Sequence, residues 1–182
     1  MDIRLASARD ANRIAEIHTS SWRNTYQNAL SPQYLADIVP HERQQLWAGR
    51  LAQPKINQHA IVAEQDDVII GFACAFTGEN PEWGTYLENL HVLQDFQLKG
   101  IGKALLAEVA RRCQQQSRDS SLCLLVNQDN VNAQGFYQAL GARNARAAVW
   151  NAPDGSAVPT YWFVWDNISA LTELCQEKRR CE

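Results

Sequence analysis

A short glycine-containing segment in the second half of the chain reads Gln97-Leu98-Lys99-Gly100-Ile101-Gly102-Lys103 and leads directly into an apolar helical pattern. Glycine lets the backbone approach a ligand closely and adopt a positive φ angle. The first turn of a helix presents unpaired N–H groups and a partial positive charge, to which the two lysines add formal charge. The segment therefore predicts a cradle for a phosphate-bearing ligand. The alternative is a glycine-rich turn that only joins a strand to a helix.

Two widespread phosphate-binding patterns do not match this segment. A dinucleotide fingerprint requires a third glycine where Leu105 stands. A Walker loop requires glycine in place of Gln97 and serine or threonine in place of Ala104. A protein that binds ATP or NAD is therefore disfavoured.

The flanking residues predict a strand–helix–strand unit. Strand patterns at 85–92 and 121–126 enclose a helix at 101–116, in which Ile101, Leu105 and Val109 form an apolar stripe. Such a unit makes its two strands parallel and adjacent through a right-handed crossover. Ligands of open α/β sheets bind beyond the carboxyl ends of parallel strands. The segments 93–103 and 127–137 are therefore expected to carry the chemistry.

The remaining elements follow from periodicity and from start and stop signals. Strands are expected at 3–6, 60–64, 68–76, 146–150 and 160–165, with a hairpin between the second and third of them. Helices are expected at 11–19, 42–53, 130–140 and 169–180, and a short helix begins at Ser31-Pro32 and is interrupted by Pro40. Segment 21–30 is expected to be irregular or helical.

Composition narrows the class of protein. The chain has 182 residues, 46% of them hydrophobic and 20% charged, as in a single soluble domain. No apolar run approaches the roughly 20 residues of a membrane-spanning helix, and the first residues lack a basic-then-apolar signal, so a cytoplasmic protein without membrane contact is expected. A net charge of −3 argues against non-specific nucleic-acid binding. The five cysteines and four histidines are scattered, so reduced thiols and no metal site are expected.

Two motifs resemble those of one enzyme family. Gln97-x-x-Gly100-x-Gly102, after a strand that ends Leu90-His91-Val92, resembles the acyl-coenzyme A signature of the GNAT superfamily of N-acetyltransferases. Asn130-x-x-Ala133-x-x-Phe136-Tyr137-x-x-Leu140-Gly141 resembles the later motif of that family, in which asparagine and tyrosine contact the cofactor. The order of elements is also similar from about residue 3 to 165. Ala142 stands where the family often has phenylalanine, a mild departure.

The resemblance implies an α/β (α+β) fold with a mixed central sheet of about six to seven strands, splayed at the cofactor site and flanked by helices. It implies one N-acetyltransferase domain at 1–168 and a C-terminal helix or tail at 169–182. Acetyl-coenzyme A would be the cosubstrate, with its pyrophosphate on residues 97–103, its pantetheine on the backbone of Leu90 and Val92, and no metal. The residues implied to contact it are Leu90, His91, Val92, Gln97, Leu98, Lys99, Gly100, Ile101, Gly102, Lys103, Asn130, Ala133, Phe136 and Tyr137.

The implied reaction moves an acetyl group from a thioester to a primary amine, which requires a general base and a general acid. Tyr137 is the candidate acid; otherwise it is a core tyrosine beside Phe136. Glu88 is the candidate base, because strand alternation places it on one face with Leu90 and Val92. His91 should then point to the opposite face and act only through packing or its backbone. The alternative for Glu88 is a half-exposed structural carboxylate.

The acceptor side is less specified. Trp22 and Tyr26 are four residues apart and share a face if they are helical, so they could form an aromatic box for an ammonium group or an apolar acceptor, or simply pack in the core. The leading interpretation is an acetyl-coenzyme A-dependent N-acetyltransferase that acts on a small-molecule amine or on a protein or peptide amino group. The alternative is an acyl-coenzyme A-binding regulatory module without efficient transfer. Some members of the family dimerise through their late strands, so the resemblance makes a homodimer one option for this chain.

Overall fold

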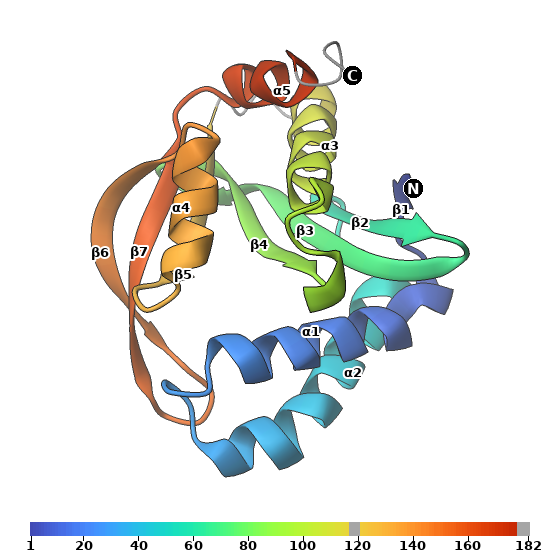
Figure 1. Ribbon diagram of the computed structural model, residues 1–182, viewed down its shortest axis with the longest axis vertical. Helices are drawn as coiled ribbons and strands as arrows, with labels where there is room; N and C mark the ends of the chain where they lie inside the picture. Colours follow the sequence, from blue (N-terminus) through green and yellow to red (C-terminus); the bar gives the residue numbers. More distant parts are fainter. Residues whose placement is uncertain (117–120, 178–182) are drawn as a thin grey trace.

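Within residues 1–116 and 121–177, which the structure describes, the computed structural model shows a mixed sheet of seven strands in the order β1-β2-β3-β4-β5-β7-β6 (Figure 1). This sheet, flanked by helices, confirms the predicted fold class. The strands are β1 (Asp2–Leu5), β2 (Gln58–Gln65), β3 (Val68–Asn80), β4 (Gly84–Val92), β5 (Leu122–Asn127), β6 (Arg143–Asn151) and β7 (Ala157–Trp165).

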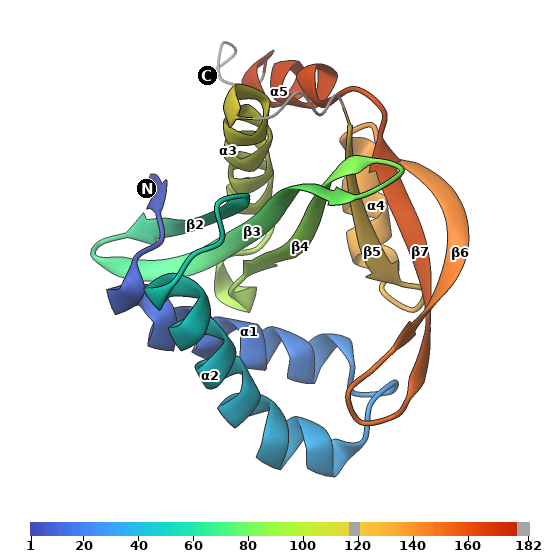
Figure 2. The same ribbon diagram turned by 180° about the vertical axis from the view of Figure 1, so that it is seen from behind.

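The helices cover both faces of the sheet. On one face lie α1 (Ala11–Thr25) and α2 (Val39–Ala52), and on the other lie α3 (Ile101–Gln116), α4 (Val131–Ala139) and α5 (Ile168–Glu177) (Figures 1 and 2). Residues 178–180 of the expected terminal helix lie outside the described residues. None of the helices in the described part of the chain is long and apolar enough to cross a membrane.

The N-terminal helices differ from expectation in two places. Helix α1 continues to Thr25, past the expected end at residue 19, because Trp22 packs into a cluster with Leu30 and Tyr34. Pro40 lies in the first turn of α2 and does not interrupt a helix. The π-helical turn Tyr34–Ile38 runs directly into α2, so the chain stays helical through Pro40.

Two apolar cores hold the helices to the sheet. The core under α3 contains Leu105, Leu106 and Val109, which are fully buried against β2, β3 and β5, and Leu171 of α5 joins it. The core under α1 and α2 contains Ile14, Ile17, Trp47 and Phe72. The 101–116 stripe predicted from periodicity is therefore the packed face of α3.

Strands β4 and β5 diverge. They are parallel, which confirms the strand–helix–strand prediction, but they pair only where Thr85 meets Leu122 and Tyr86 meets Cys123. Beyond these positions β4 stays paired with β3, and β5 stays paired with β7. The two strands separate toward their carboxyl ends, as Figure 1 shows. Backbone groups on their facing edges therefore lie outside the ladder that joins these strands.

A bulge interrupts β4 at Glu88. The pairing with β3 passes from Cys74–Asn89 to Ala75–Leu87 and skips Glu88. A bulge inserts one residue and resets which side chains face each side of the sheet. Simple alternation across β4 therefore fails at the position where the sequence analysis used it.

Gly71 of β3 is expected to tolerate no side chain. A Cβ atom there would lie 2.8 Å from the carbonyl oxygen of His91, a backbone atom of β4. Gly71→Ala should therefore lower the free energy of unfolding by about 1–3 kcal/mol, as overpacking does, measured by urea denaturation.

Gly49 of α2 supplies the matched control, since a Cβ atom there meets nothing within 4 Å. Gly49→Ala should raise the free energy of unfolding by about 0.5–1 kcal/mol, because alanine is the better helix former. Equal denaturation midpoints for both variants would contradict the close approach of β3 and β4.

Candidate functional site

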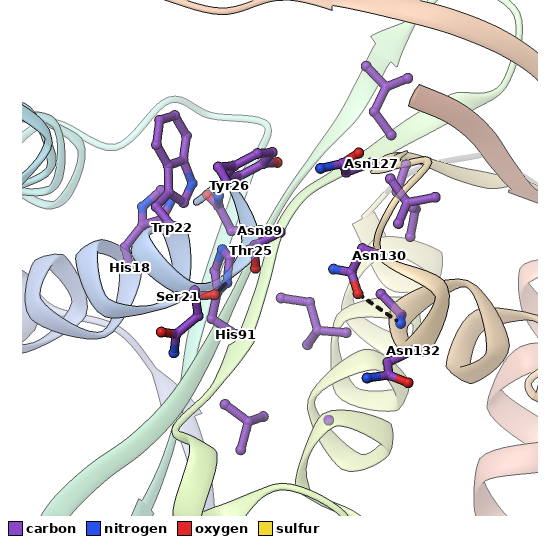
Figure 3. Close-up of a pocket in the computed structure, with 18 of the residues that line it drawn as sticks. His18, Ser21, Trp22, Thr25, Tyr26, Asn89, His91, Asn127, Asn130 and Asn132 are labelled. Carbon is purple, nitrogen blue, oxygen red and sulfur yellow. Dashed lines mark hydrogen bonds between the residues drawn. The ribbon is translucent and has the colours of Figure 1, made fainter. Parts of the chain in front are cut away.

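A cleft of about 1240 Å³ opens where β4 and β5 separate. Its walls come from α1 and α2 on one side and from the first turn of α3 and α4 on the other (Figure 3). Pockets for one small ligand are typically about 300–1,000 Å³. The cleft is therefore large enough for two substrates at once.

The glycine-containing loop forms one end of the cleft. Leu98 and Gly100 adopt positive φ angles of 60° and 80°, which turn the chain sharply into α3. Gln97 Nε2 donates to the carbonyl oxygen of Val92 at 3.1 Å, which ties the loop to the end of β4. The first turn of α3, with Gly102 and Lys103, lines the cleft. The amides and the positive charge of this first turn thus face the space where an anion would bind.

The side chains of two residues in the predicted segment do not face the cleft. Ile101 is 4% exposed and belongs to the core under α3. The ammonium of Lys99 lies 5.1 Å from the ring centre of Phe96. Their backbone can still contribute to the loop, but their side chains are engaged away from the cleft.

Helix α4 supplies the opposite wall. Asn130 caps its N-terminus, with Oδ1 accepting from the backbone N–H of Ala133 at 3.1 Å (Figure 3). Both residues line the cleft, as does Phe136. A Cβ atom on Gly102 would lie 3.4 Å from the Phe136 ring, so the small residue lets α3 and α4 pack closely.

Tyr137 lines the cleft from a largely buried position. Its ring packs edge-on against Phe136 and Trp165, at centroid distances of 5.2 and 5.8 Å. Burial raises the pKa of the Tyr137 hydroxyl, and Tyr26 across the cleft raises it further. The phenol therefore remains protonated over the working pH range and can donate a hydrogen bond.

The side chain of Glu88 does not lie where strand alternation placed it. Because of the bulge, it faces α2, and both of its oxygens accept hydrogen bonds from Arg50, Nη2–Oε1 at 2.9 Å and Nη1–Oε2. Leu90 faces the core under α3 instead. Glu88 still lines the cleft, but as one half of a bidentate ion pair.

The expectation that His91 lies on the opposite face from Glu88 is wrong for the same reason. The His91 ring faces α1, where Nδ1 is 2.7 Å from Ser21 Oγ and the ring centre is 4.9 Å from that of His18 (Figure 3). Burial lowers the pKa of His91 to about 4, so the imidazole is neutral at neutral pH. Side chain and backbone of His91 both contribute to the cleft wall.

An aromatic wall, which we define as Trp22, Tyr26 and Trp150, closes the acceptor end. The three ring centres are 5.3–5.6 Å apart. Burial raises the pKa of Tyr26 to about 12. Trp150 comes from β6, and its hairpin is tied to the segment after α1 because the Ser31 N–H donates to Asp154 at 2.8 Å.

Several cleft residues were missed by sequence reasoning. Arg43 and Arg50 come from α2, Asn89 from β4 and His18 from α1. Arg43 and Arg50 could have been found, because their spacing around Trp47 is the i, i+4, i+7 pattern of one helix face. Two arginines on the apolar stripe of a helix signal a buried site. The others depend on which faces meet in three dimensions.

The remaining tryptophans and the cysteines play other roles. Trp83 packs against Trp162 at 5.4 Å, and Trp165 Nε1 donates to the carbonyl oxygen of Leu140 at 2.8 Å. The thiols of Cys74, Cys113 and Cys123 are buried and belong to no disulfide, while the side chains of Cys175 and Cys181 lie outside the described part. Across residues 1–116 and 121–177, no group of three or more His, Cys, Asp or Glu side chains is arranged to hold a metal ion.

Comparison with known proteins points to one family. A family model described as "Acetyltransferase (GNAT) family" matches residues 11–142. The uncharacterized N-acetyltransferase YuaI of Bacillus subtilis (strain 168) is 25% identical over 174 residues, which cover 94% of this chain and 96% of that protein. The peptidyl-lysine N-acetyltransferase YiaC of Escherichia coli (strain K12) is 27% identical over 155 residues, covering 85% of this chain and 88% of that protein.

The fold also matches solved structures. PaiA N-acetyltransferase from Thermoplasma acidophilum, solved in complex with coenzyme A, superposes with a TM-score of 0.68 at 20% identity. The match covers 87% of this chain and 96% of that one. At this level of identity the similarity concerns the fold.

Proposed function

Because the chain belongs to the acetyltransferase (GNAT) family, we propose that it transfers the acetyl group of acetyl-coenzyme A to a primary amine by direct attack in a ternary complex. The observation that carries the proposal is the cleft between the diverging strands β4 and β5, which ends at the first turn of α3. Its volume of about 1240 Å³ supports the simultaneous presence of two substrates.

The residues at the α3 end of the cleft fit an extended anionic thioester carrier. The amides of the first turn and Lys103 suit a pyrophosphate, and Asn130 and Phe136 form the wall beside it. The unpaired edge of β4 at Leu90 offers backbone groups to an amide-containing arm. When bound, acetyl-coenzyme A supplies an activated acetyl group on a thiol that can leave.

Tyr137 is proposed to assist the leaving thiol. A free thiol has a pKa of about 8.5, below that of the buried phenol, so complete proton transfer from the hydroxyl to the departing thiolate is unfavourable and the hydroxyl acts as a hydrogen-bond donor. The Tyr137 hydroxyl is a fixed donor and strengthens its hydrogen bond as negative charge appears on sulfur. Its packing against Trp165 holds the hydroxyl direction without cost at the moment of reaction.

Glu88 is proposed to accept the proton that the amine loses, directly or through water. An alkylammonium has a pKa of about 10.4 and cannot attack until it is deprotonated. The new C–N bond then forms as the C–S bond breaks, and the amine proton passes to the Glu88 carboxylate. Arg50 fixes the carboxylate toward the cleft through its two hydrogen bonds.

Glu88→Gln should lower kcat by about tenfold at pH 7, with water replacing the carboxylate as a poorer base. The deficit should shrink as the pH approaches the amine pKa of about 10.4, because a free amine needs no base. The measurement is the ratio of wild-type to variant kcat from pH 6 to pH 10, pH values chosen to span the two regimes.

Arg50→Gln is the control for the ion pair. It removes the partner of Glu88 but keeps the carboxylate, so a purely structural role predicts a deficit that is the same at every pH for both variants. A pH-independent ratio for Glu88→Gln would remove Glu88 from the proton path.

Titration calorimetry with coenzyme A, followed by a thiol-release screen, tests the function as a whole. The screen includes lysine peptides, since the relative YiaC is described as a peptidyl-lysine N-acetyltransferase, as well as polyamines, aminoglycosides and amino acids. Uptake of coenzyme A and thiol release with at least one amine are expected. Uptake without release from any amine would favour a regulatory module, and the absence of uptake would overturn the assignment of the cleft.

A further inference from the structure

Arg43 of α2 brings a positive charge into the acceptor end of the cleft. Its guanidinium carbon lies 4.4 Å from the centre of the Trp22 ring, and the side chain is 13% exposed. A buried charge costs free energy unless charged or polar partners compensate it. The partners of Arg43 therefore decide what the cleft can bind.

The compensation of Arg43 within the described residues is incomplete. Its ion-pair partner is Glu42, at 3.5 Å from Nη2 to Oε2, and the same oxygen accepts a 2.5 Å hydrogen bond from the Tyr34 hydroxyl. Arg43 Nε is buried with no hydrogen-bond partner. Burial and the nearby charge of Arg50 lower the pKa of the Arg43 guanidinium. The pKa of Arg50 is instead raised, because its guanidinium forms a bidentate pair with Glu88. The charge of Arg43 is therefore only partly compensated, by a carboxylate that Tyr34 shares.

His18 adds a second donor without an acceptor to the same wall. Its Nδ1 accepts from Trp47 Nε1 at 3.0 Å, and burial holds its pKa well below 6.5, so the proton of the neutral ring is on Nε2. Nε2 is buried with no partner among the described residues. Both donors left over on the α1–α2 wall thus match a ligand group that accepts hydrogen bonds.

The β4 side of the cleft has the opposite polarity. Asn89 Oδ1 is a buried acceptor without a partner in the described part of the chain, and Asn89 lines the cleft (Figure 3). Glu88 is its neighbour in the chain. Acceptors on this side match the N–H groups of an amine, so the two sides of the cleft complement an amine and an anion carried by one molecule.

Arg43 also affects which ligand groups the aromatic wall can bind. A cation already lies over the face of Trp22, and that face is the site an ammonium group would need for a cation–π contact. The aromatic box for an ammonium group is therefore disfavoured. Tyr26 and Trp150, whose ring planes are inclined by 50°, leave an angled apolar surface instead, which suits an aliphatic or aromatic side chain.

We propose that the acceptor is an amine that also carries a carboxylate, bound at Arg43, and an apolar group that packs on the aromatic wall. This inference rests on the proposed function for the identity of the amine as acceptor. A free α-amino acid with an apolar side chain has all three groups. A lysine peptide with an acidic neighbour shares the amine and the carboxylate, so the experiment separates these two sources.

The test measures binding, so it does not depend on turnover. Calorimetry on the coenzyme A-loaded protein compares L-phenylalanine with phenethylamine and with L-phenylalaninamide, which keep the amine and the ring but lack the carboxylate. A lysine peptide with an adjacent glutamate is compared with the same peptide carrying glutamine. The carboxylate should tighten binding at least about tenfold, as hydrogen bonds to a charged group do.

Arg43→Gln should erase that tenfold preference while leaving phenethylamine binding and coenzyme A affinity unchanged. Arg146→Gln is the matched control, because Arg146 also lies over a tryptophan, at 4.8 Å from the centre of the Trp83 ring, but pairs with Glu82 at 2.9 Å and is not among the residues that line the cleft. It should keep the preference. Unchanged coenzyme A affinity in Arg43→Gln shows that the variant is folded.

Each outcome decides one point. Tighter binding of L-phenylalanine than of its carboxylate-free analogues supports a free amino acid as the acceptor. Tighter binding of only the glutamate peptide than of the glutamine peptide supports the carboxylate site but assigns the carboxylate to a peptide. Equal binding within both pairs, or an equal loss for charged and neutral members in Arg43→Gln, overturns the inference. Preference in binding without thiol release leaves the carboxylate site standing and removes the proposed transfer.

Discussion

Replacing Tyr137 with phenylalanine is expected to lower kcat by about 100-fold or more, the size of effect that loss of a positioned acid or donor produces. The substitution removes only the hydroxyl oxygen. The ring keeps its edge-on contacts with Phe136 and Trp165, so the fold should be preserved. The affinity for coenzyme A should change little, since the donor acts on charge that develops only during the reaction. Single-turnover thiol release measures the chemical step directly.

Tyr161→Phe provides the matched control. Tyr161 lies on β7, where it pairs with Val126 and Ala147, and it packs beside the core under α3. The same loss of one hydroxyl should leave turnover near the wild-type value. Near-normal single-turnover rates in Tyr137→Phe would mean that the thiolate leaves without help from this residue, and Tyr137 would then be a core aromatic residue.

Stability should fall steeply on acidification from pH 6.5 to about pH 4, with His91 as a main cause. Burial lowers the pKa of His91 to about 4, and that of His18 well below 6.5, whereas both have a pKa near 6.5 in the unfolded chain. The unfolded chain therefore binds protons first as the pH drops. This part of the stability is fully present above pH 6.5 and is lost as the pH falls through the folded-state values.

The expected loss from His91 alone is about 3 kcal/mol, because each pKa unit corresponds to about 1.4 kcal/mol. Carboxylates act in a lower window. Arg4 lowers the pKa of Asp10 to about 2, so that the stability from this ion pair is lost only below an unfolded-state value of about 3.9. Urea denaturation at about pH 7, 5.5 and 4 follows the histidine window, and a further measurement at about pH 2.5 lies in the carboxylate window.

His91→Gln should flatten the slope between pH 6.5 and pH 4, and His41→Gln should not. His41 is exposed on α2, with Gln45 as its partner at 2.8 Å, so it serves as the control for loss of one imidazole. Identical slopes for wild type and His91→Gln would show that the buried ring near Ser21 is not a source of the acid sensitivity.

Sequence reasoning succeeded where short-range chemistry decides structure. Gly100 adopts the positive φ angle expected of a glycine in this loop, and a helix was expected from Asn130 onward, where the structure has Asn130 as the cap of α4. The apolar stripe of α3 and the parallel pairing of β4 with β5 follow from periodicity and chain reversal in the same way. These features need little information from distant parts of the chain.

The acceptor end could not be predicted for the opposite reason. The faces of Glu88 and His91 depend on a bulge, which is set by how β4 fits β3 and α2 and leaves no mark in the alternation pattern. The aromatic wall joins α1 to β6, which are far apart in sequence. Pro40 was misread because the same residue starts a helix as readily as it ends one.

Strands β4 and β5 separate after two paired positions and leave an open seam between them. Within residues 1–116 and 121–177, no other strand closes this seam. A small molecule that fills the seam binds only the native form, and it therefore raises the free energy of unfolding by about 2.7 kcal/mol at a concentration of 100 times its Kd. Under the proposed function, a larger supply of the acyl carrier would therefore raise the folded fraction of the protein as well as its rate of turnover.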